Sequence, residues 1–178
     1  FAVAMSDCPR AAEVAGMIAA LSQHGIRSRY FQGDISRATD RKAILDSVLG
    51  QFGRIDVFVN ATCSEARLKA DLLELIEEDL DITVNSTLKG SFFLTQLVAN
   101  QMIGQLQTDP EFAGVIVNLS ALGTVDEATN YPGDWLCRAG VSMTTLLWAH
   151  RLAEHGIAVF EVRAGAIRGE GSALVTDN

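Results

Sequence analysis

Short apolar runs alternate along this chain with longer segments whose apolar residues repeat at a helical period. Runs that are apolar almost throughout are typical of parallel strands, because helices cover such strands on both faces. Strands that alternate with helices of about ten or more residues indicate βαβ units. The pattern therefore predicts an α/β fold in which a doubly wound parallel sheet carries helices on both faces. We expect strands at Phe1–Met5, Ile26–Phe31, Ile55–Asn60, Gly114–Leu119 and Ile157–Val162, and helices at about Arg10–His24, Thr39–Phe52, Asp71–Glu78, within Leu80–Met102 and from Tyr131 to His155.

The ends of the first two helices carry recognisable signals. Ser6 and Asp7 are suited to cap the first helix, with Pro9 in its first turn. Gly25 and Gly53 are expected to end the first and second helices. No internal repeat or low-complexity segment interrupts the pattern, so we expect all 178 residues to form a single domain.

Composition narrows the classes of partner. The chain has 14 Lys and Arg against 22 Asp and Glu, which gives a formal net charge of -8 at pH 7. An acidic chain without a basic run argues against binding to a nucleic-acid backbone. Hydrophobic residues make up 48% of the chain, and no apolar stretch reaches the roughly 20 residues of a membrane span. Cys8, Cys63 and Cys137 are scattered without metal-ligand spacing, so we expect a reduced, cytoplasmic protein without a metal site.

Three segments resemble one known family. Phe52–Asn60 reads Phe-Gly-Arg-Ile-Asp-Val-Phe-Val-Asn, Leu88–Gln96 reads Leu-Lys-Gly-Ser-Phe-Phe-Leu-Thr-Gln, and Glu161–Arg168 contains Glu-Val-Arg-x-Gly-x-Ile-Arg. They resemble the short-chain dehydrogenase/reductase family, and within it the 3-ketoacyl-(acyl-carrier-protein) reductases. The likeness extends over essentially the whole chain. It implies a Rossmann-like sheet and an NAD(P)-dependent oxidoreductase that transfers hydride between a carbonyl and an alcohol.

In that family an Asn, a Ser, a Tyr and a Lys form the catalytic tetrad, and the last two stand as Tyr-x-x-x-Lys at the head of a long apolar helix. The family's Tyr protonates the substrate oxygen, its Lys activates the Tyr and holds the nicotinamide ribose, and its Ser fixes the substrate oxygen. Here the corresponding positions hold Thr87, Ala121, Asp134 and Arg138, so all four are substituted. The resemblance thus implies the frame of a reductase with altered chemistry.

The substituted residues are poorly suited to reducing a ketone. An aspartate side chain is an anion at neutral pH, so Asp134 has no proton to give, and its charge opposes the charge that develops on the substrate oxygen. Ala121 lacks the hydroxyl donor, whereas Arg138 can still hold a ribose hydroxyl. The alternative to a retained binding role is a plain i,i+4 ion pair at the surface or in a cleft.

The resemblance also implies a site for NAD or NADP. Asp34 and Ile35 follow the second strand, where the family contacts the adenine, and Arg138 is expected to hold the nicotinamide ribose. Asp7 ends the first strand, where a carboxylate can accept from the adenosine ribose and favours NAD over NADP. The alternatives are an ordinary turn residue at Asp34 and a helix N-cap at Asp7.

Two further segments are expected at the cofactor. Asn60 and Ala61 stand where the family has Asn-Asn-Ala-Gly, but Cys63 replaces the Gly at a point where the backbone approaches the cofactor closely. This bulk counts against tight dinucleotide binding. Gly165 and Ile167 match the family's Pro-Gly-x-Ile-x-Thr segment after the last predicted strand.

The helix that carries Met143–Trp148 is apolar on more than one face, which predicts a homo-oligomer. The resemblance implies the same, because the family forms dimers and tetramers through this helix and the one that carries Phe92–Phe93. His24, His150 and His155 stand near helix ends or on helical faces, so we expect capping or surface residues rather than catalytic bases.

The family's first strand with its Gly-rich turn, and its last strand, have no counterpart in this sequence. In the family's sheet that first strand lies between the strands that correspond to Phe1–Met5 and Ile55–Asn60, which leaves these two without a common neighbour. Unpaired backbone groups along a buried strand edge are costly. We therefore expect the sequence to be part of a longer chain, and the alternative is a shorter protein completed by another chain.

Three functional hypotheses follow. The first is an NAD(P)-dependent short-chain oxidoreductase that is impaired in carbonyl reduction. The second is a pseudoenzyme that binds a nucleotide or a partner subunit. The third is an enzyme that uses Asp134 as a base.

Overall fold

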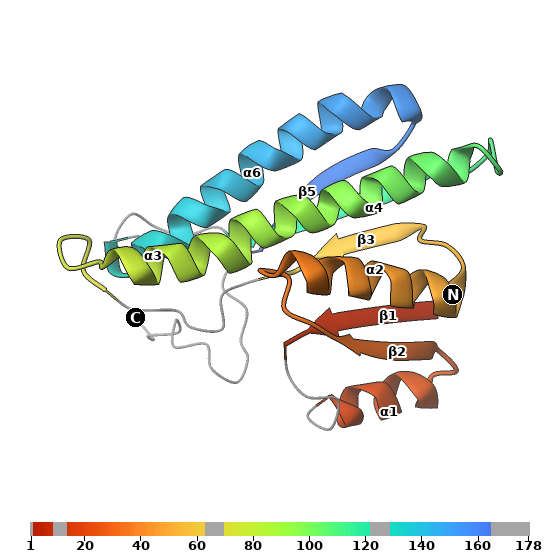
Figure 1. Cartoon of the computed structure of the whole chain (residues 1–178), viewed down its shortest axis with the longest axis horizontal. Helices are drawn as coiled ribbons and strands as arrows, with labels where there is room; N and C mark the ends of the chain where they lie inside the picture. The colour runs from red at the N-terminus through yellow and green to blue at the C-terminus, as the bar shows by residue number, and fades with distance from the viewer. Residues whose placement is uncertain (1, 9–13, 63–69, 122–128, 165–178) are drawn as a thin grey trace. The chain divides into compact units, whose positions relative to one another are not determined.

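The computed structural model describes residues 2–8, 14–62, 70–121 and 129–164. The chain forms two compact units, one made of Phe1–Asp56 and Lys89–Phe112 and the other of Val57–Leu88 and Ala113–Asn178. We call them the first and the second unit and describe each by itself (Figure 1).

The first unit is built on two parallel strands. β1 (Ala2–Asp7) pairs with β2 (Arg27–Gln32), in a register that runs from Ala2 opposite Arg27 to Asp7 opposite Gln32. Its helices are α1 (Ala15–Gln23), α2 (Ala38–Phe52) and α4 (Ser91–Leu106). α2 ends at Gly53, whose φ of 78° is the left-handed conformation that favours glycine. The buried apolar residues of α2 and α4 are Ile44, Leu94, Val98, Ala99 and Met102.

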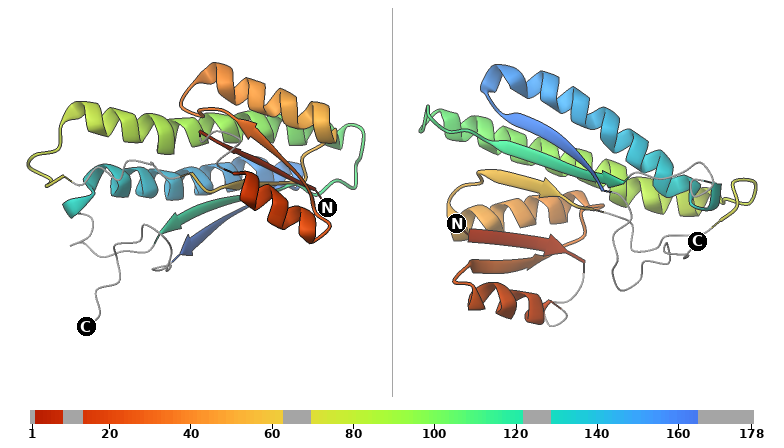
Figure 2. Two further views of the ribbon diagram at one scale, coloured as in Figure 1. Left: turned by 90° about the horizontal axis from the view of Figure 1, so that it is seen from below. Right: turned by 180° about the vertical axis from the view of Figure 1, so that it is seen from behind.

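The second unit holds a parallel sheet in the order β3-β4-β5. Its strands are β3 (Val57–Asn60), β4 (Val115–Ala121) and β5 (Ala158–Ala164). Its helices are α3 (Glu77–Thr83), the π-helical η1 (Val84–Gly90), which continues into the first unit, α6 (Pro132–Leu152) and the short η2 (Ala153–His155). Figure 2 shows the long α6 beside β4 and β5, which it contacts.

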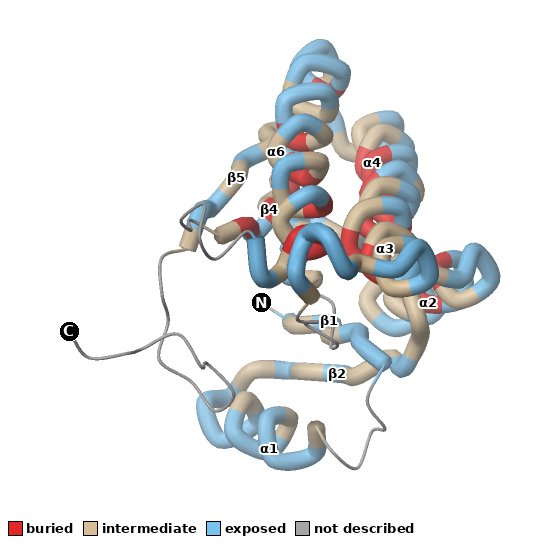
Figure 3. Tube along the Cα trace, turned by 90° about the vertical axis from the view of Figure 1, so that its left-hand side faces the viewer, coloured by how far each residue is buried: buried red, intermediate tan, exposed pale blue. Residues whose placement is uncertain are grey.

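The core of the second unit lies between β4 and α6. Ile116, Asn118 and Ser120 alternate along β4 as buried residues, and Cys137 and Val141 are buried on α6. Figure 3 shows these buried stretches along α6 and on β4. On the opposite face of the sheet, apolar side chains of all three strands remain exposed over the described residues: Val57, Val59, Leu119, Phe160 and Val162.

The predicted parallel α/β fold is confirmed, and each predicted strand lies within about two residues of an observed one. Among the described strands, β1 pairs only with β2 and β3 pairs only with β4. The sequence therefore predicts the five strands that the structure describes.

Two local predictions are wrong. The helix expected at Asp71–Glu78 begins only at Glu77, because Asp71 forms a turn in which it accepts from the amides of Leu73 and Glu74, both at 2.9 Å. The helix expected within Leu80–Met102 is confirmed as α4, which follows seven π-helical residues. Ser6 and Asp7 lie in β1, and α1 starts at Ala15 without a side-chain cap. The carboxylate of Asp7 instead accepts from the amide of Cys8 at 2.8 Å.

Candidate functional site

Asp134 and Arg138, predicted at the Tyr and Lys positions, form an ion pair at the head of α6. Arg138 Nε donates to Asp134 Oδ2 at 2.8 Å, and the side chains are only 14% and 7% exposed, respectively. The predicted i,i+4 pair is confirmed, and of the two locations left open, the surface or a cleft, it does not lie at the surface. The reason is close helix packing: a Cβ on Gly133 would lie 3.6 Å from Leu80 and from Thr83 on α3, so α3 covers the start of α6.

Two of the four residues predicted at the tetrad positions carry buried polar atoms that have no hydrogen-bond partner among the described residues. These atoms are Oδ1 of Asp134 and Oγ1 of Thr87. Thr87 lies in η1, and π-helical turns are frequent at functional sites. A buried polar atom without a partner is unfavourable by about 1–3 kcal/mol, so both atoms are suited to meet a water or a ligand.

The other two positions behave differently. Ala121 ends β4 and offers no hydroxyl. Its neighbour Ser120 has a hydroxyl, but that group is buried and donates to Glu161 Oε1 at 2.6 Å. No serine at the end of β4 therefore presents a free donor to a substrate.

Glu161 on β5 collects three donors. Its Oε1 accepts from the hydroxyls of Ser120 and Ser142, and its Oε2 accepts from Arg163 NH2 at 3.1 Å. Burial alone would raise the pKa of Glu161, but the hydrogen bonds from Arg163, Ser120 and Ser142 and the charge of Arg163 outweigh it and hold the pKa below its usual value of 4.5. Glu161 thus ties β5 to both β4 and α6.

Replacing this carboxylate should destabilise the second unit. We expect Glu161→Gln to lower the free energy of unfolding by about 1–2 kcal/mol at neutral pH, because a neutral amide accepts more weakly from the hydroxyls and the guanidinium. Since folding lowers the pKa of Glu161, the carboxylate stabilises the wild type above about pH 4.5 and this stabilisation is lost as the pH falls further. Urea unfolding from pH 7 to pH 3 should therefore show the two proteins converging.

The control for this experiment is Glu154→Gln. Glu154 pairs with Arg151, but both side chains are more than half exposed, so little change is expected. Equal stability of the two variants at neutral pH would contradict the role given to Glu161.

Asn60, predicted at the cofactor, belongs to a buried polar network. Asn60 Nδ2 donates to Asn118 Oδ1 at 3.2 Å, and Asn118 Nδ2 donates to Thr145 Oγ1 at 2.9 Å. Asn60 Oδ1 accepts from the hydroxyl of Thr62 at 2.8 Å. Sequence reasoning missed Asn118 and Thr145, although an Asn inside an apolar strand requires a partner. A contact of Asn60 or Ala61 with a cofactor stays a prediction.

The first unit has a hollow of about 340 Å³ where β1 and β2 end, lined by Cys8, Gln32, Gly33, Asp34 and Asp40. In α/β sheets, ligands bind outside the carboxyl ends of the strands. Asp34 Oδ1 accepts from the amide of Ser36 at 2.9 Å, so Asp34 is a turn residue and also lines the hollow. Both sequence interpretations of Asp34 therefore remain compatible with its position.

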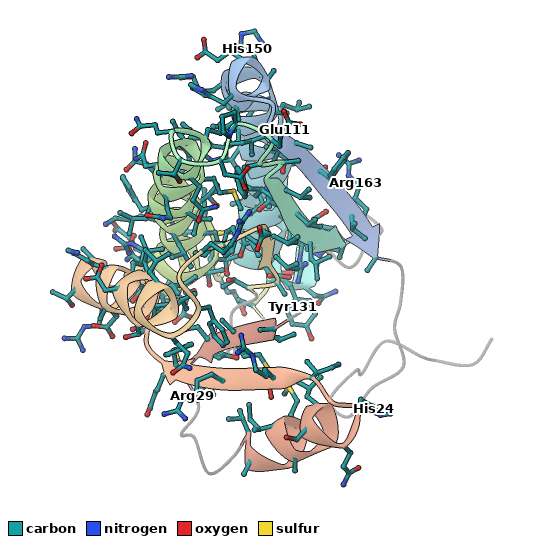
Figure 4. All side chains as sticks on the ribbon, turned by 90° about the vertical axis from the view of Figure 1, so that its right-hand side faces the viewer. His24, Arg29, Glu111, Tyr131, His150 and Arg163 are labelled. Atoms are coloured by element: carbon teal, nitrogen blue, oxygen red, sulfur yellow. The ribbon has the colours of Figure 1, made fainter. Side chains whose placement is uncertain are left out.

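The remaining candidates are placed as follows. His24 and His150 lie at the ends of α1 and α6 and point outward, and His155 ends η2, as expected for capping or surface residues (Figure 4). Cys137 is fully buried, and burial together with the charge of Asp134 raises the pKa of its thiol to about 11 against the opposing effect of Arg138, which makes it a packing residue. The candidates Cys63, Gly165 and Ile167 lie outside the described residues.

The described residues contain neither a cluster of metal ligands nor a helix that could span a membrane. They contain no group of three or more His, Cys, Asp or Glu side chains placed to hold a metal ion. Within the same part of the chain, no helix has the length and apolar character needed to cross a bilayer.

Comparison with known proteins places this chain in a family. The family described as Enoyl-(Acyl carrier protein) reductase matches residues 1–177. The 3-oxoacyl-[acyl-carrier-protein] reductase FabG of Thermotoga maritima is 36% identical over 141 residues, which is 75% of this chain and 52% of that protein. Sorbitol-6-phosphate 2-dehydrogenase of Klebsiella pneumoniae is 31% identical over 155 residues, which is 83% of this chain and 56% of that protein.

Solved structures agree with this placement. A 3-oxoacyl-[acyl-carrier protein] reductase from Brucella melitensis, crystallised in complex with NAD, is 31% identical with a TM-score of 0.85, over 97% of this chain and 66% of its own. The chain belongs to the short-chain dehydrogenase/reductase family. Within that family it is similar to the 3-oxoacyl-[acyl-carrier-protein] reductases, and it spans about half the length of the curated relatives named above.

Proposed function

We propose that this chain is an NAD(P)-dependent oxidoreductase of the 3-oxoacyl reductase type that is impaired in carbonyl reduction. Family membership supports the oxidoreductase class. The observation that carries the impairment is the Asp134–Arg138 ion pair, which occupies the positions of the family's proton donor and its activator.

The described residues fit the adenosine half of a dinucleotide. The hollow beside β1 and β2 is lined by Asp34 and Asp40, whose carboxylates can accept hydrogen bonds from an adenine amino group or from ribose hydroxyls. Asp7 ends β1 and directly precedes Cys8, which lines the hollow, so the carboxylate of Asp7 is a third candidate acceptor. NAD(P), when bound, supplies or accepts the hydride. Arg138 is proposed to hold a ribose hydroxyl of its nicotinamide side.

Asp134, Arg138 and Ala121, in contrast, do not fit rapid ketone reduction. Asp134 is held by Arg138 as an ion pair and presents an acceptor, Oδ1, where the reaction needs a proton donor. A carboxylate next to an oxygen that gains negative charge raises the energy of the transition state. Ala121 adds no donor to offset this effect.

Two other functions are kept as candidates. The free oxygen of Asp134 favours proton acceptance, so an enzyme that uses Asp134 as a base is one of them. The other is a pseudoenzyme that binds a nucleotide or a partner subunit. A cytoplasmic location is part of the proposal in each case.

Binding and turnover measured in sequence separate these functions. NADH and NADPH are titrated first, and reduction of an acetoacetyl thioester is then measured in wild type and in Asp134→Ala. Binding with slow turnover that Asp134→Ala leaves unchanged supports the impaired oxidoreductase. Turnover that Asp134→Ala abolishes supports the base, and binding without any turnover supports the pseudoenzyme. Absence of nucleotide binding would contradict the proposed function.

The acidic residues near the hollow predict a cofactor preference. We expect NADH to bind at least about tenfold more tightly than NADPH, since carboxylates repel the additional 2′-phosphate. Asp7→Asn should narrow the ratio of the two dissociation constants in a calorimetric titration. Asp46→Asn, an exposed carboxylate on α2, is the control and should leave the ratio unchanged. Equal affinities in the wild type would contradict the preference.

We also propose that the protein is a homo-oligomer. α6 exposes large apolar side chains along one side, and on α4 Phe93 is exposed in part. Apolar faces of this kind are normally covered by another subunit. We expect Leu146→Asp with Leu147→Asp to reduce the mass measured by light scattering to that of one chain. Met17→Asp, at an exposed apolar position on α1, should not change it, and a monomeric wild type would contradict the proposal.

A further inference from the structure

Arg41 on α2 is a buried arginine without an acidic partner. Arg41 is only 6% exposed, and within the described part of the chain its side chain forms no ion pair. Its NH1 group instead donates to the carbonyl oxygens of Ile35 at 2.5 Å and of Ser36 at 3.0 Å. A buried guanidinium therefore holds two successive peptide groups of the loop between β2 and α2.

The neighbouring residue, Asp40, also holds this loop. Asp40 Oδ2 accepts from the amide of Asp34 at 3.2 Å. The hydrogen bond from the amide of Asp34 is the largest cause of a lowered pKa at Asp40. Two charged side chains at the start of α2 thus fix the backbone of residues 34–36, the cation on carbonyl oxygens and the anion on an N–H group.

Phe93 on α4 completes the arrangement. Its ring centroid lies 5.5 Å from the guanidinium carbon of Arg41, a cation–π contact that also shields the charge from water. Hydrogen bonds made in such a shielded place are stronger than those in water. However, an apolar side chain of similar size would fill the space without the cost of burying a charge. The charged group therefore fixes the loop, which packing by an apolar side chain would not do.

We propose that Arg41 is a positioning residue for the adenosine end of the nucleotide site. It fixes the backbone that carries Asp34, one of the residues that line the hollow beside β1 and β2. The inference rests on the proposed dinucleotide binding. It predicts that Arg41 affects the adenosine half of the ligand and leaves the nicotinamide half unaffected.

The test compares Arg41→Met and Arg41→Lys with the control Arg54→Met. Arg54 lies over the ring of Phe112 at 5.4 Å, a contact like that of Arg41 with Phe93, but it is exposed and pairs with Asp56 and Asp109. We expect Arg41→Met to raise the dissociation constant for ADP-ribose about tenfold, equivalent to one lost net hydrogen bond of about 1.4 kcal/mol, and to leave that for nicotinamide mononucleotide unchanged. Arg41→Lys should recover part of the lost affinity for ADP-ribose, because its single ammonium group can donate to one of the two carbonyl oxygens. The control Arg54→Met should change neither dissociation constant.

Hydrogen exchange in the ligand-free protein tests the loop without any nucleotide. The amides of Ser36 and Arg37 should exchange at least about tenfold faster in Arg41→Met, while amides in the middle of β2 keep their rates. If wild type binds no ADP-ribose, the proposed function fails and the positioning role fails with it. If wild type binds ADP-ribose but Arg41→Met changes neither its affinity nor the exchange of the loop, the positioning role alone is overturned. If Arg41→Met does not fold, Phe93→Leu replaces it. That variant removes the shielding ring and keeps the charge, and unchanged affinity and exchange in it would overturn the proposal.

Discussion

Restoring three family side chains together, with Ala121→Ser, Asp134→Tyr and Arg138→Lys, is expected to raise NADH-dependent reduction of an acetoacetyl thioester by at least about 100-fold. The tyrosine would supply a proton donor where the wild type presents the free oxygen of a carboxylate. The lysine would favour the ionised form of that tyrosine, and the serine would return the missing hydroxyl donor. Removal of the carboxylate also removes a charge that opposes the transition state.

The matched control keeps the shape and omits the proton. A variant with Ala121→Ser, Asp134→Phe and Arg138→Lys has the same ring at position 134 without the hydroxyl group. Circular dichroism and urea unfolding should first establish that both triple variants fold, because Asp134 is buried and α3 packs against the neighbouring Gly133. Rates are then compared at saturating NADH. Equal rates in the two folded variants would show that the substituted tetrad is not what limits reduction.

Much of the fold could be predicted because parallel strands are apolar on both faces. Runs such as Ile55–Asn60 and Ile157–Val162 predicted β3 and β5 to within about two residues. The start of α3 could not be predicted from the acidic composition of residues 71–78, because the turn at Asp71 depends on local hydrogen bonds to Leu73 and Glu74. The π-helical turn η1 was also missed, because its backbone geometry produces no repeating pattern of apolar residues that the sequence could reveal.

The candidate site was predictable in its residues and not in its surroundings. The spacing of Asp134 and Arg138 predicts an ion pair, but the burial of that pair depends on the contact of Gly133 with α3, which lies about 50 residues earlier in the chain. Glu161 carried a weak signal, as a carboxylate in the otherwise apolar predicted strand Ile157–Val162. Its partners Ser120 and Ser142 come from other elements, and only the folded chain brings the three together.

Removing the cation of the buried pair should cause the largest loss of stability. We expect Arg138→Met to lower the free energy of unfolding by about 3 kcal/mol at neutral pH, because the carboxylate of Asp134 then stays buried without its cation. The double variant with Asp134→Leu and Arg138→Met should recover most of this loss, since two apolar side chains carry no cost of burying charge. Urea unfolding of the wild type, both single variants and the double variant gives the coupling energy of the pair.

The chain offers a control pair with the same spacing in an exposed place. Lys42 and Asp46 on α2 are also four residues apart, with 2.7 Å between their charged groups, but their side chains are 71% and 57% exposed. Water already solvates both charges, so Lys42→Met should cost at most about 0.5 kcal/mol. The difference between the two losses measures how far the environment of Asp134 departs from that of a solvated carboxylate. Similar small losses at both sites would place the Asp134–Arg138 pair in contact with water, and the argument that this carboxylate opposes reduction would then lose its physical basis.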